Sequence, residues 1–397
     1  MKRLAKAAYH IGGQPMFELL AKANELEKNG QRILHFEIGD PNFDSLPDVV
    51  QAAIDALKEG KTHYAVSRGL PELRDAICSA TEEELGFRPT REQVLVIPAN
   101  AVIYFLTRCV VNPGEEVIIP DPGFPTYRSA IDFIGAKAIG VPLEEKNEFR
   151  MSPDDIRGKI TNRTRLIIIN SPQNPTGSVM TREEIENIAA LAEKEDVYLL
   201  SDEVYQSVIY DRMQSWSPSL RDQCKERTVI LNSFSKTHAM AGWRLGYAIG
   251  PEEVIEKMSL LLQTTISCVP PFVQYGGISA LSAANRPILL DRVNELRQRR
   301  DCLVKGLNNL PGVSCVIPKG AFYVFPNITK TGLTSEEFAQ CMLEKVGVVL
   351  LPGTNFGCCG EGYVRLCYAS VSLEAIKEGL GRMKAALDEI FCEARVK

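Results

Sequence analysis

LNSFSKTHAMAGWRLGYAIG, residues 231–250, is the stretch that says most about the fold of this chain. Runs of aliphatic and β-branched residues at 228–231 and 245–249 are typical of buried strands, and they enclose a polar segment. Charged side chains between two buried strands need a compensating partner. Lys236 and Arg244 therefore indicate a polar site beside a sheet.

Lys236 lies at the centre of this segment. A deprotonated lysine amine attacks carbonyl carbons, and a neighbouring cation such as Arg244 or a partly desolvated pocket lowers its pKa enough to allow this. Ser233, Ser235 and Arg244 are suited to bind an anion beside the amine. A carbonyl compound that carries a phosphate and is held as a Schiff base describes pyridoxal phosphate. The alternative is a solvated surface lysine, the commonest role of this residue.

Composition limits the class of protein. The 397 residues are 45% hydrophobic and 24% charged, which predicts a large core and about two domains. The net charge of -5 argues against a nucleic-acid or anionic-membrane partner. No apolar run suits a membrane span or a signal peptide, so we expect a cytoplasmic chain. Eleven cysteines without a CxxC pair predict free thiols, and four scattered histidines predict no metal site.

Short apolar runs alternate with amphipathic segments from residue 46 to about residue 282. Predicted strands are VLVI at 94–97, EVIIP at 116–120, LIIIN at 166–170 and VYLLSD at 197–202, and predicted helices include 182–194 and 251–262. Such alternation predicts a mostly parallel sheet with helices on both faces. Ligands bind at the carboxyl ends of the strands of such sheets, so the residues that follow each run are the candidates.

Polar or aromatic residues do follow each of these runs. Asn100 and Ala101 open a predicted helix, whose free amides suit a phosphate, although any helix start looks similar. Phe124 follows the second run, and Asn174 begins an NPTG turn after the third. Asp202 ends the fourth run, where a carboxylate must be paired. Packing, a plain turn and a helix cap are the structural alternatives for these three residues.

The segment around Lys236 resembles the cofactor-lysine motif of the class I aminotransferases, the aspartate aminotransferase-like pyridoxal-phosphate enzymes of fold type I. The order Asn174, Asp202, Tyr205, Lys236 and Arg244 follows the order in that family. The resemblance implies an α/β fold: a large domain with a mostly parallel seven-stranded sheet flanked by helices, and a smaller α+β domain. It also implies pyridoxal 5'-phosphate as the cofactor.

The resemblance implies the role of each residue that would contact the cofactor ring. Lys236 would hold the cofactor covalently and act as general base and acid. Asp202 would pair with the ring nitrogen and keep it protonated. Tyr205 and Asn174 would donate hydrogen bonds to the ring oxygen, and Phe124 would stack on the ring.

The resemblance also assigns the phosphate and the substrate. The phosphate would be bound by Asn100, Ala101, Ser233, Ser235 and Arg244, and by Tyr64 of a neighbouring subunit, which predicts a homodimer with shared active sites. Where Ala99 stands the family usually has glycine, so the backbone there must avoid a left-handed conformation. The substrate would contact the backbone near Gly39, together with Asn174. Arg365, in the apolar run YVRLCYA, would bind the α-carboxylate.

The alternation stops beyond residue 282 and a smaller α+β domain is expected. We predict a long helix at 287–309, strands near 314–317, 322–325, 348–351 and 363–367, and a final helix to about residue 391. The expected domains are residues 1–45 as an N-terminal arm and part of the small domain, 46–285 as the large cofactor-binding domain, and 286–397 as the C-terminal small domain.

The function that the resemblance implies is amino-group transfer, EC 2.6.1.-, between an L-amino acid and a 2-oxo acid by a ping-pong aldimine mechanism. Aspartate-specific relatives bind the second carboxylate through cations at two positions, which here hold Asn100 and Thr264 or a neighbour. We therefore expect a neutral or broad amino donor. A lyase, cyclase or decarboxylase on the same fold is the alternative, because these enzymes use the same residues.

Overall fold

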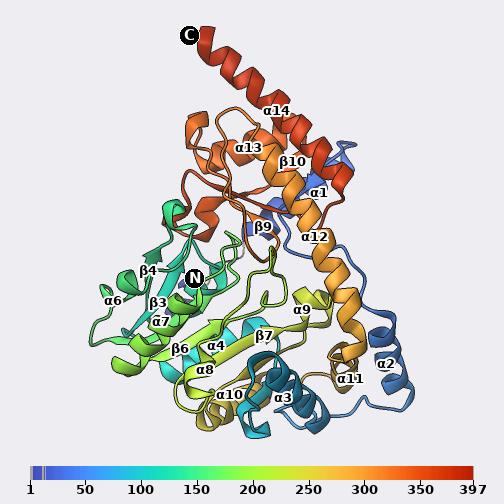
Figure 1. Ribbon diagram of the computed structural model, residues 1–397, viewed down its shortest axis with the longest axis vertical. Coiled ribbons are helices and arrows are strands. Elements are labelled where there is room, and N and C mark those ends of the chain that lie inside the picture. Colours follow the sequence, from blue (N-terminus) through green and yellow to red (C-terminus); the bar gives the residue numbers. More distant parts are fainter. Residues whose placement is uncertain (1–2, 11–12, 14, 397) are drawn as a thin grey trace.

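The computed structural model describes residues 3–10, 13 and 15–396. A large sheet with its helices forms one part, and a smaller group of strands and helices lies at the other end, with the long helix α12 (Arg286–Leu307) running between them (Figure 1). Among the described residues, no helix combines the length and the apolar composition needed to cross a membrane. The predicted arm at residues 1–45 lies partly outside the described residues, at 1–2, 11–12 and 14.

The large sheet has seven strands in the order β2-β8-β7-β6-β5-β3-β4. They are β2 (Val94–Val96), β3 (Glu116–Asp121), β4 (Lys137–Pro142), β5 (Thr164–Asn170), β6 (Tyr198–Asp202), β7 (Thr228–Ser233) and β8 (Gly246–Ile249). Strand β8 runs antiparallel to the other six strands, which are parallel to one another. The predicted mostly parallel seven-stranded sheet is confirmed. Sequence periodicity missed β4, because this edge strand is half-exposed and lacks a continuous apolar run.

Helices connect these strands and complete the fold. They are α1 (Pro15–Lys28), α2 (Pro47–Lys58), α3 (Pro71–Leu85), α4 (Ala99–Val110), α5 (Pro125–Phe133), α6 (Pro153–Arg157), α7 (Arg182–Lys194), α8 (Ser219–Asp222), α9 (Phe234–Thr237), α10 (Glu252–Thr265), α11 (Pro271–Ala280), α12, α13 (Ser335–Val346) and α14 (Leu373–Val396). Helix α7 has the predicted bounds because its ends are coded locally. Thr181 and Glu184 form a capping box at its start, with hydrogen bonds of 2.8 and 3.2 Å.

Both faces of the large sheet are buried because successive strand residues point in opposite directions. Leu95 and Ile168 pack on one face against α4, α5 and α10. Val96 packs on the other face against α3 and α11, and Ile167 against α7. Burying each such side chain stabilises the fold by about 1.5–3 kcal/mol, so the sheet is a rigid support for the polar residues at its edge.

The smaller part contains a three-stranded antiparallel sheet, ordered β11 (Leu351–Pro352), β12 (Val364–Cys367), β9 (Tyr323–Val324), and a parallel pair, β1 (Leu34–His35) with β10 (Val348–Val349). Helices α12, α13 and α14 bury Leu303, Phe338 and Ile376 in its core.

The strand predicted at 314–317 is wrong. Ser314 forms a single bridge with Asn327, and Pro318 follows, which cannot donate to a ladder. The Cys315 amide donates instead to the Asn308 side chain at 2.9 Å. This side-chain contact replaces the ladder hydrogen bond that a strand would make.

Candidate active site

A cavity of about 450 Å³ lies at the carboxyl ends of the parallel strands, within the size range of small-molecule sites. Most of the residues singled out from the sequence line it: Gly39, Asn100, Phe124, Asn174, Asp202, Tyr205, Ser233, Ser235, Lys236, Arg244 and Arg365. They come from segments far apart in the chain, which the sheet brings together because parallel strands end at one edge.

Lys236 is half-buried in the short helix α9, directly after β7. Its Nζ donates to the Gly39 carbonyl at 2.6 Å. Burial lowers the pKa of Lys236, and the charges of Arg365 and Arg244 lower it further, whereas Asp40 and Cys367 raise it. The amine therefore becomes deprotonated more readily than a surface lysine, as a nucleophile or general base requires.

Asp202 ends β6 and is buried, at 4% exposure. The Tyr127 hydroxyl donates to its Oδ2 at 2.5 Å, and the Val204 amide donates to its Oδ1 at 3.3 Å. Burial raises the pKa of Asp202 to about 6, although these two hydrogen bonds lower it. Among the described residues no Lys, Arg or His forms an ion pair with this carboxylate, so the carboxylate can pair with a cationic group of a ligand.

The raised pKa of Asp202 predicts how stability depends on pH. In protein freed of any cofactor, the folded state holds the Asp202 proton more tightly than the unfolded state, whose pKa is near 3.8. The stability that this tighter proton binding contributes is fully present below pH 4. It is lost as the pH rises through about 6, and the free energy of unfolding changes by about 3 kcal/mol. We expect the difference in unfolding free energy between wild type and Asp202→Asn to fall over this window, measured by urea denaturation at each pH.

Glu203 offers a matched control for this measurement. It is equally buried, and burial raises its pKa from 4.5 to about 7, while hydrogen bonds from Ser217 and Ser201 lower it. The difference in unfolding free energy between wild type and Glu203→Gln should therefore keep falling up to about pH 7, a higher pH than for Asp202→Asn. A pH-independent difference between wild type and Asp202→Asn would contradict the prediction.

An anion-binding corner lies beside Lys236. Helix α4 starts with Ala99 and Asn100 at the cavity, and its first amides point their partial positive charge there. Ala99 is not left-handed, so alanine replaces the expected glycine without strain. Ser233 and Ser235 are buried, with their hydroxyls 2.9 Å apart.

Arg244 lines the same corner and remains exposed. Its backbone is left-handed, with φ at 55°, a conformation that is unfavourable for arginine by roughly 1–2 kcal/mol. Its Nη1 donates to the Ala241 carbonyl at 2.8 Å. No described carboxylate forms an ion pair with it, so the guanidinium can bind an external anion.

Arg365 is 2% exposed in β12, and no Asp or Glu of the described residues forms an ion pair with it. Its Nη1 donates to Asn174 Oδ1 at 3.0 Å, its Nη2 donates to the Glu37 carbonyl, and its Nε has no partner. The guanidinium lies over the rings of Tyr323 and Phe356, at 4.5 and 4.8 Å. A buried guanidinium without a counter-ion is suited to a carboxylate ligand.

Two predicted residues lie outside the cavity of this chain. The Ala101 amide donates to the Pro98 carbonyl at 2.9 Å and is used within the helix turn. Tyr64 is 88% exposed, in the loop between α2 and α3. Its predicted role in a neighbouring subunit stays a prediction.

Several residues that no sequence pattern indicated also shape the site. Tyr127 holds Asp202, and Tyr323 holds Tyr205 through hydroxyls 2.8 Å apart. A Cβ at Gly39 would overlap the Tyr323 ring, which explains the glycine. Asn170 accepts from the Asn174 amide at 2.9 Å and donates to the Asp202 carbonyl at 2.9 Å, which joins the NPTG turn to β6. Asn170 ends a predicted strand, a signal that could have found it.

Comparisons with known proteins identify the family. A model of aminotransferase class I and II matches residues 31–383. The aspartate aminotransferase of Pyrococcus horikoshii is 41% identical over 373 residues, 94% of each chain. The probable aspartate/prephenate aminotransferase of Aquifex aeolicus is 38% identical, with 98% of this chain and 100% of that protein covered. The crystal structure of an aromatic aminotransferase from Pyrococcus horikoshii has a TM-score of 0.88 at 38% identity, covering 93% of this chain and 99% of that chain.

The chain belongs to the class I and II aminotransferases. It is an enzyme of the group EC 2.6.1.-, in a family of pyridoxal-phosphate enzymes with fold type I. The predicted family, fold class and amino-group transfer are confirmed. These relatives are named as aminotransferases, so they give no support to the lyase, cyclase or decarboxylase alternative.

Proposed function

We propose that this aminotransferase binds pyridoxal 5'-phosphate in the 450 Å³ cavity and transfers the amino group of a broad range of L-amino acids to a 2-oxo acid. One observation carries the proposal. A lysine amine of lowered pKa, a buried carboxylate without a cation and a buried guanidinium without a carboxylate all face the same cavity. Each needs a partner that a cofactor and an amino acid would supply.

The residues around the cavity fit the cofactor. Lys236 would hold it covalently, and Asp202 would pair with its ring nitrogen. Phe124 lines the cavity with a flat apolar face for the ring. The phosphate would lie at the start of α4, near Ser235 and Arg244. When bound, the cofactor supplies an electron sink that stabilises negative charge at the substrate α-carbon.

The chain's own groups would bind, orient and move a proton. Lys236 Nζ would take the proton from the substrate α-carbon and return it on the other side of the reaction. Burial of Asp202 and its short hydrogen bond from Tyr127 would fix the carboxylate against the ring nitrogen. Arg365 would bind the α-carboxylate with its planar fork, and Asn174 would keep the fork oriented.

The lining of the cavity supports a neutral or broad donor. Its described cations are Lys236, Arg244 and Arg365, and each already has a role. Thr264 is exposed on α10, with its hydroxyl bonded to the Leu260 carbonyl at 3.2 Å. No described cation of this chain therefore remains for a second carboxylate. Apolar side chains such as Ile38 line part of the wall.

Single-turnover kinetics with a panel of donors tests the function and its range. We expect aspartate, alanine-like and aromatic donors to react with rate constants within about tenfold of one another. No charged residue of the pocket favours one side chain, so their activation free energies should differ by no more than about 1.4 kcal/mol. Mass spectrometry should detect the matching 2-oxo acid for each donor. A large preference for aspartate would contradict the broad range. An altered product without a 2-oxo acid would contradict amino-group transfer itself.

We further propose a homodimer with shared sites, in which Tyr64 reaches the phosphate of the neighbouring subunit. Its 88% exposure in one chain leaves the hydroxyl free for such a contact. Mixing inactive Lys236→Ala with Tyr64→Ala should restore activity, because hybrid dimers would contain one intact site. Random mixing gives about one half hybrids, so we expect about a quarter of wild-type activity. No recovery after subunit exchange, checked by native mass spectrometry, would contradict shared sites.

The proposed division of the chain remains residues 1–45, 46–285 and 286–397. The pairing of β1 with β10 supports it, because it joins the N-terminal segment to the smaller part. We also propose that the enzyme acts in the cytoplasm, where its eleven cysteines would stay reduced.

A further inference from the structure

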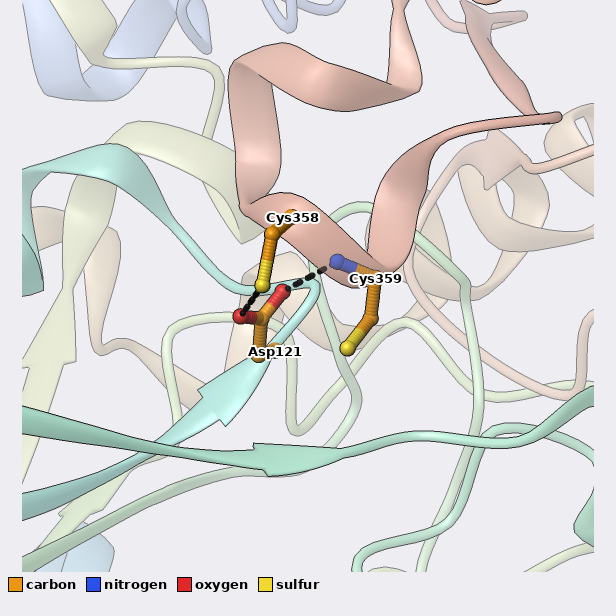
Figure 2. Close-up of side chains that lie close together, drawn as sticks. All are labelled: Asp121, Cys358 and Cys359. Atoms are coloured by element: carbon orange, nitrogen blue, oxygen red, sulfur yellow. Dashed lines mark hydrogen bonds between the residues drawn. The ribbon is translucent and has the colours of Figure 1, made fainter.

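A cluster of three side chains lies outside the residues assigned above, where the end of β3 meets the loop before β12. Asp121 ends β3, and Cys358 and Cys359 begin the short helix η8 (Cys358–Gly360). The Cys358 thiol donates to Asp121 Oδ2 at 3.1 Å, and the Cys359 amide donates to Oδ1 at 3.1 Å. Figure 2 shows both cysteines beside the carboxylate, and one oxygen and both sulfur atoms lie within 4.8 Å of one another.

The Asp121 carboxyl group has no cationic partner among the described residues. Its carboxylate is buried, at 3% exposure, and its hydrogen-bond donors are one thiol and one backbone amide. No described Lys, Arg or His forms an ion pair with this carboxylate. The charge of Lys159 lowers the pKa of the neighbouring Cys359 thiol, but Lys159 does not form an ion pair with Asp121. A buried carboxylate without a counter-charge is unfavourable, so this position favours a bound cation.

Two thiolates and a carboxylate are the ligands of a thiophilic divalent cation. Zn²⁺ binds sulfur at about 2.3 Å and oxygen at about 2.0–2.2 Å in a tetrahedron, so its ligand atoms lie within about 4 Å of one another. The three ligand atoms lie within 4.8 Å of one another, so they are close to this spacing before any cation binds. We propose that Asp121, Cys358 and Cys359 form a site for a thiophilic divalent cation such as Zn²⁺.

The fourth ligand is water. A cavity of about 240 Å³, lined by Asp121, Phe124 and Gly357, adjoins the cluster and gives solvent a way in. Both thiols lose their protons to solvent when the thiolates bind the cation, so the affinity rises with pH.

The bound cation joins two segments that are 237 residues apart in sequence. The segment after β3 lines the active-site cavity with Phe124, and the loop at 353–360 contacts Arg365, another residue of that cavity. The Gly123 amide donates to the Phe356 carbonyl at 2.7 Å, and the Phe356 ring packs on Arg365. Cation binding therefore restrains the loop at 353–360 against the end of β3, and we expect slower amide hydrogen exchange there.

The test is competition between the untagged holoenzyme and a chromophoric zinc chelator. We expect one equivalent of Zn²⁺ per chain and a loss of affinity of at least about 100-fold in the Cys358→Ser/Cys359→Ser double variant, because loss of a mere outer-shell partner weakens binding by about 10–100-fold. Cys392→Ser removes the other exposed cysteine of the described residues and should bind like wild type. Circular dichroism and Tm confirm that the variants are folded.

Titration with Co²⁺ gives an independent measurement. Thiolate ligation should produce a charge-transfer band in the near ultraviolet, which each single serine variant reduces by about half and the double variant abolishes. Equal Zn²⁺ affinity in wild type and the double variant, or no stoichiometric binding at micromolar Zn²⁺, overturns the proposal.

Discussion

Lys236→Ala is expected to lower kcat/KM for amino-group transfer by at least about 10⁴-fold. In the proposed function the variant would lose both the covalent attachment and the proton transfer at the substrate α-carbon, and proton transfer alone contributes about 10²–10⁴-fold. The half-buried amine donates a hydrogen bond to the Gly39 carbonyl. No other described lysine lines the cavity, so none can replace it. Steady-state kinetics with an amino acid and a 2-oxo acid provide the measurement.

Lys257 is a suitable control, since it is exposed on α10, and Lys257→Ala should retain wild-type activity. Added primary amines of increasing size should partly restore Lys236→Ala, because the truncation leaves room for them in the cavity. Circular dichroism should show a native fold in both variants. Activity of Lys236→Ala within about tenfold of wild type would remove the lysine from the mechanism.

Arg365→Gln is expected to lower kcat/KM for amino acids by about 10²–10³-fold. Removing one partner of a buried, hydrogen-bonded charge pair costs about 2–5 kcal/mol, and in the proposed function the partner left unpaired would be the substrate carboxylate. Arg365→Lys should be impaired less, because it keeps the charge but not the planar fork. The loss should appear mainly in KM, as expected for an interaction made in both ground and transition states.

A donor without an α-carboxylate separates substrate binding from a structural role. Wild type should prefer an amino acid over the corresponding simple amine, and Arg365→Gln should lose most of this preference. Arg300 is the matched control, because it is equally buried and lies 4.7 Å over the Tyr210 ring, but is paired with Asp211 at 2.8 Å. Arg300→Lys should lower Tm and leave the preference unchanged. An unchanged preference in Arg365→Gln would contradict the assignment.

Most residues of the candidate active site could be found from sequence because each follows a strand whose apolar pattern is strong. Asp202 ends a run buried on both sides, and Lys236 follows another within a few residues. In a parallel sheet the carboxyl ends of such strands lie at one edge, so local patterns predicted that these residues meet in one site. Exposed edge strands such as β4 carry a weaker pattern, and this strand was missed.

Contacts between side chains from distant segments could not be found in this way. Tyr127 reaches Asp202 because α5 packs on the sheet with that face inward. Tyr323 of β9 meets Tyr205, which follows β6, although the two residues are 118 positions apart in sequence. A tyrosine also packs well in an ordinary core position, so its presence in the sequence does not indicate which group its hydroxyl hydrogen-bonds.

The cluster of Asp121, Cys358 and Cys359 shows the same division. The cysteines lack a CxxC pair and the histidines are scattered, so we expected no metal site. Cys358 and Cys359 are adjacent in sequence, but nothing in the sequence indicates that Asp121, 237 residues away, lies beside them. By itself the sequence determined most strands of the large sheet, the polar residues at the strand ends and the family, since periodicity and short motifs are local properties. The tertiary structure decided which distant side chains touch and which charges stay unpaired, because burial and pairing depend on how the two parts of the chain pack together.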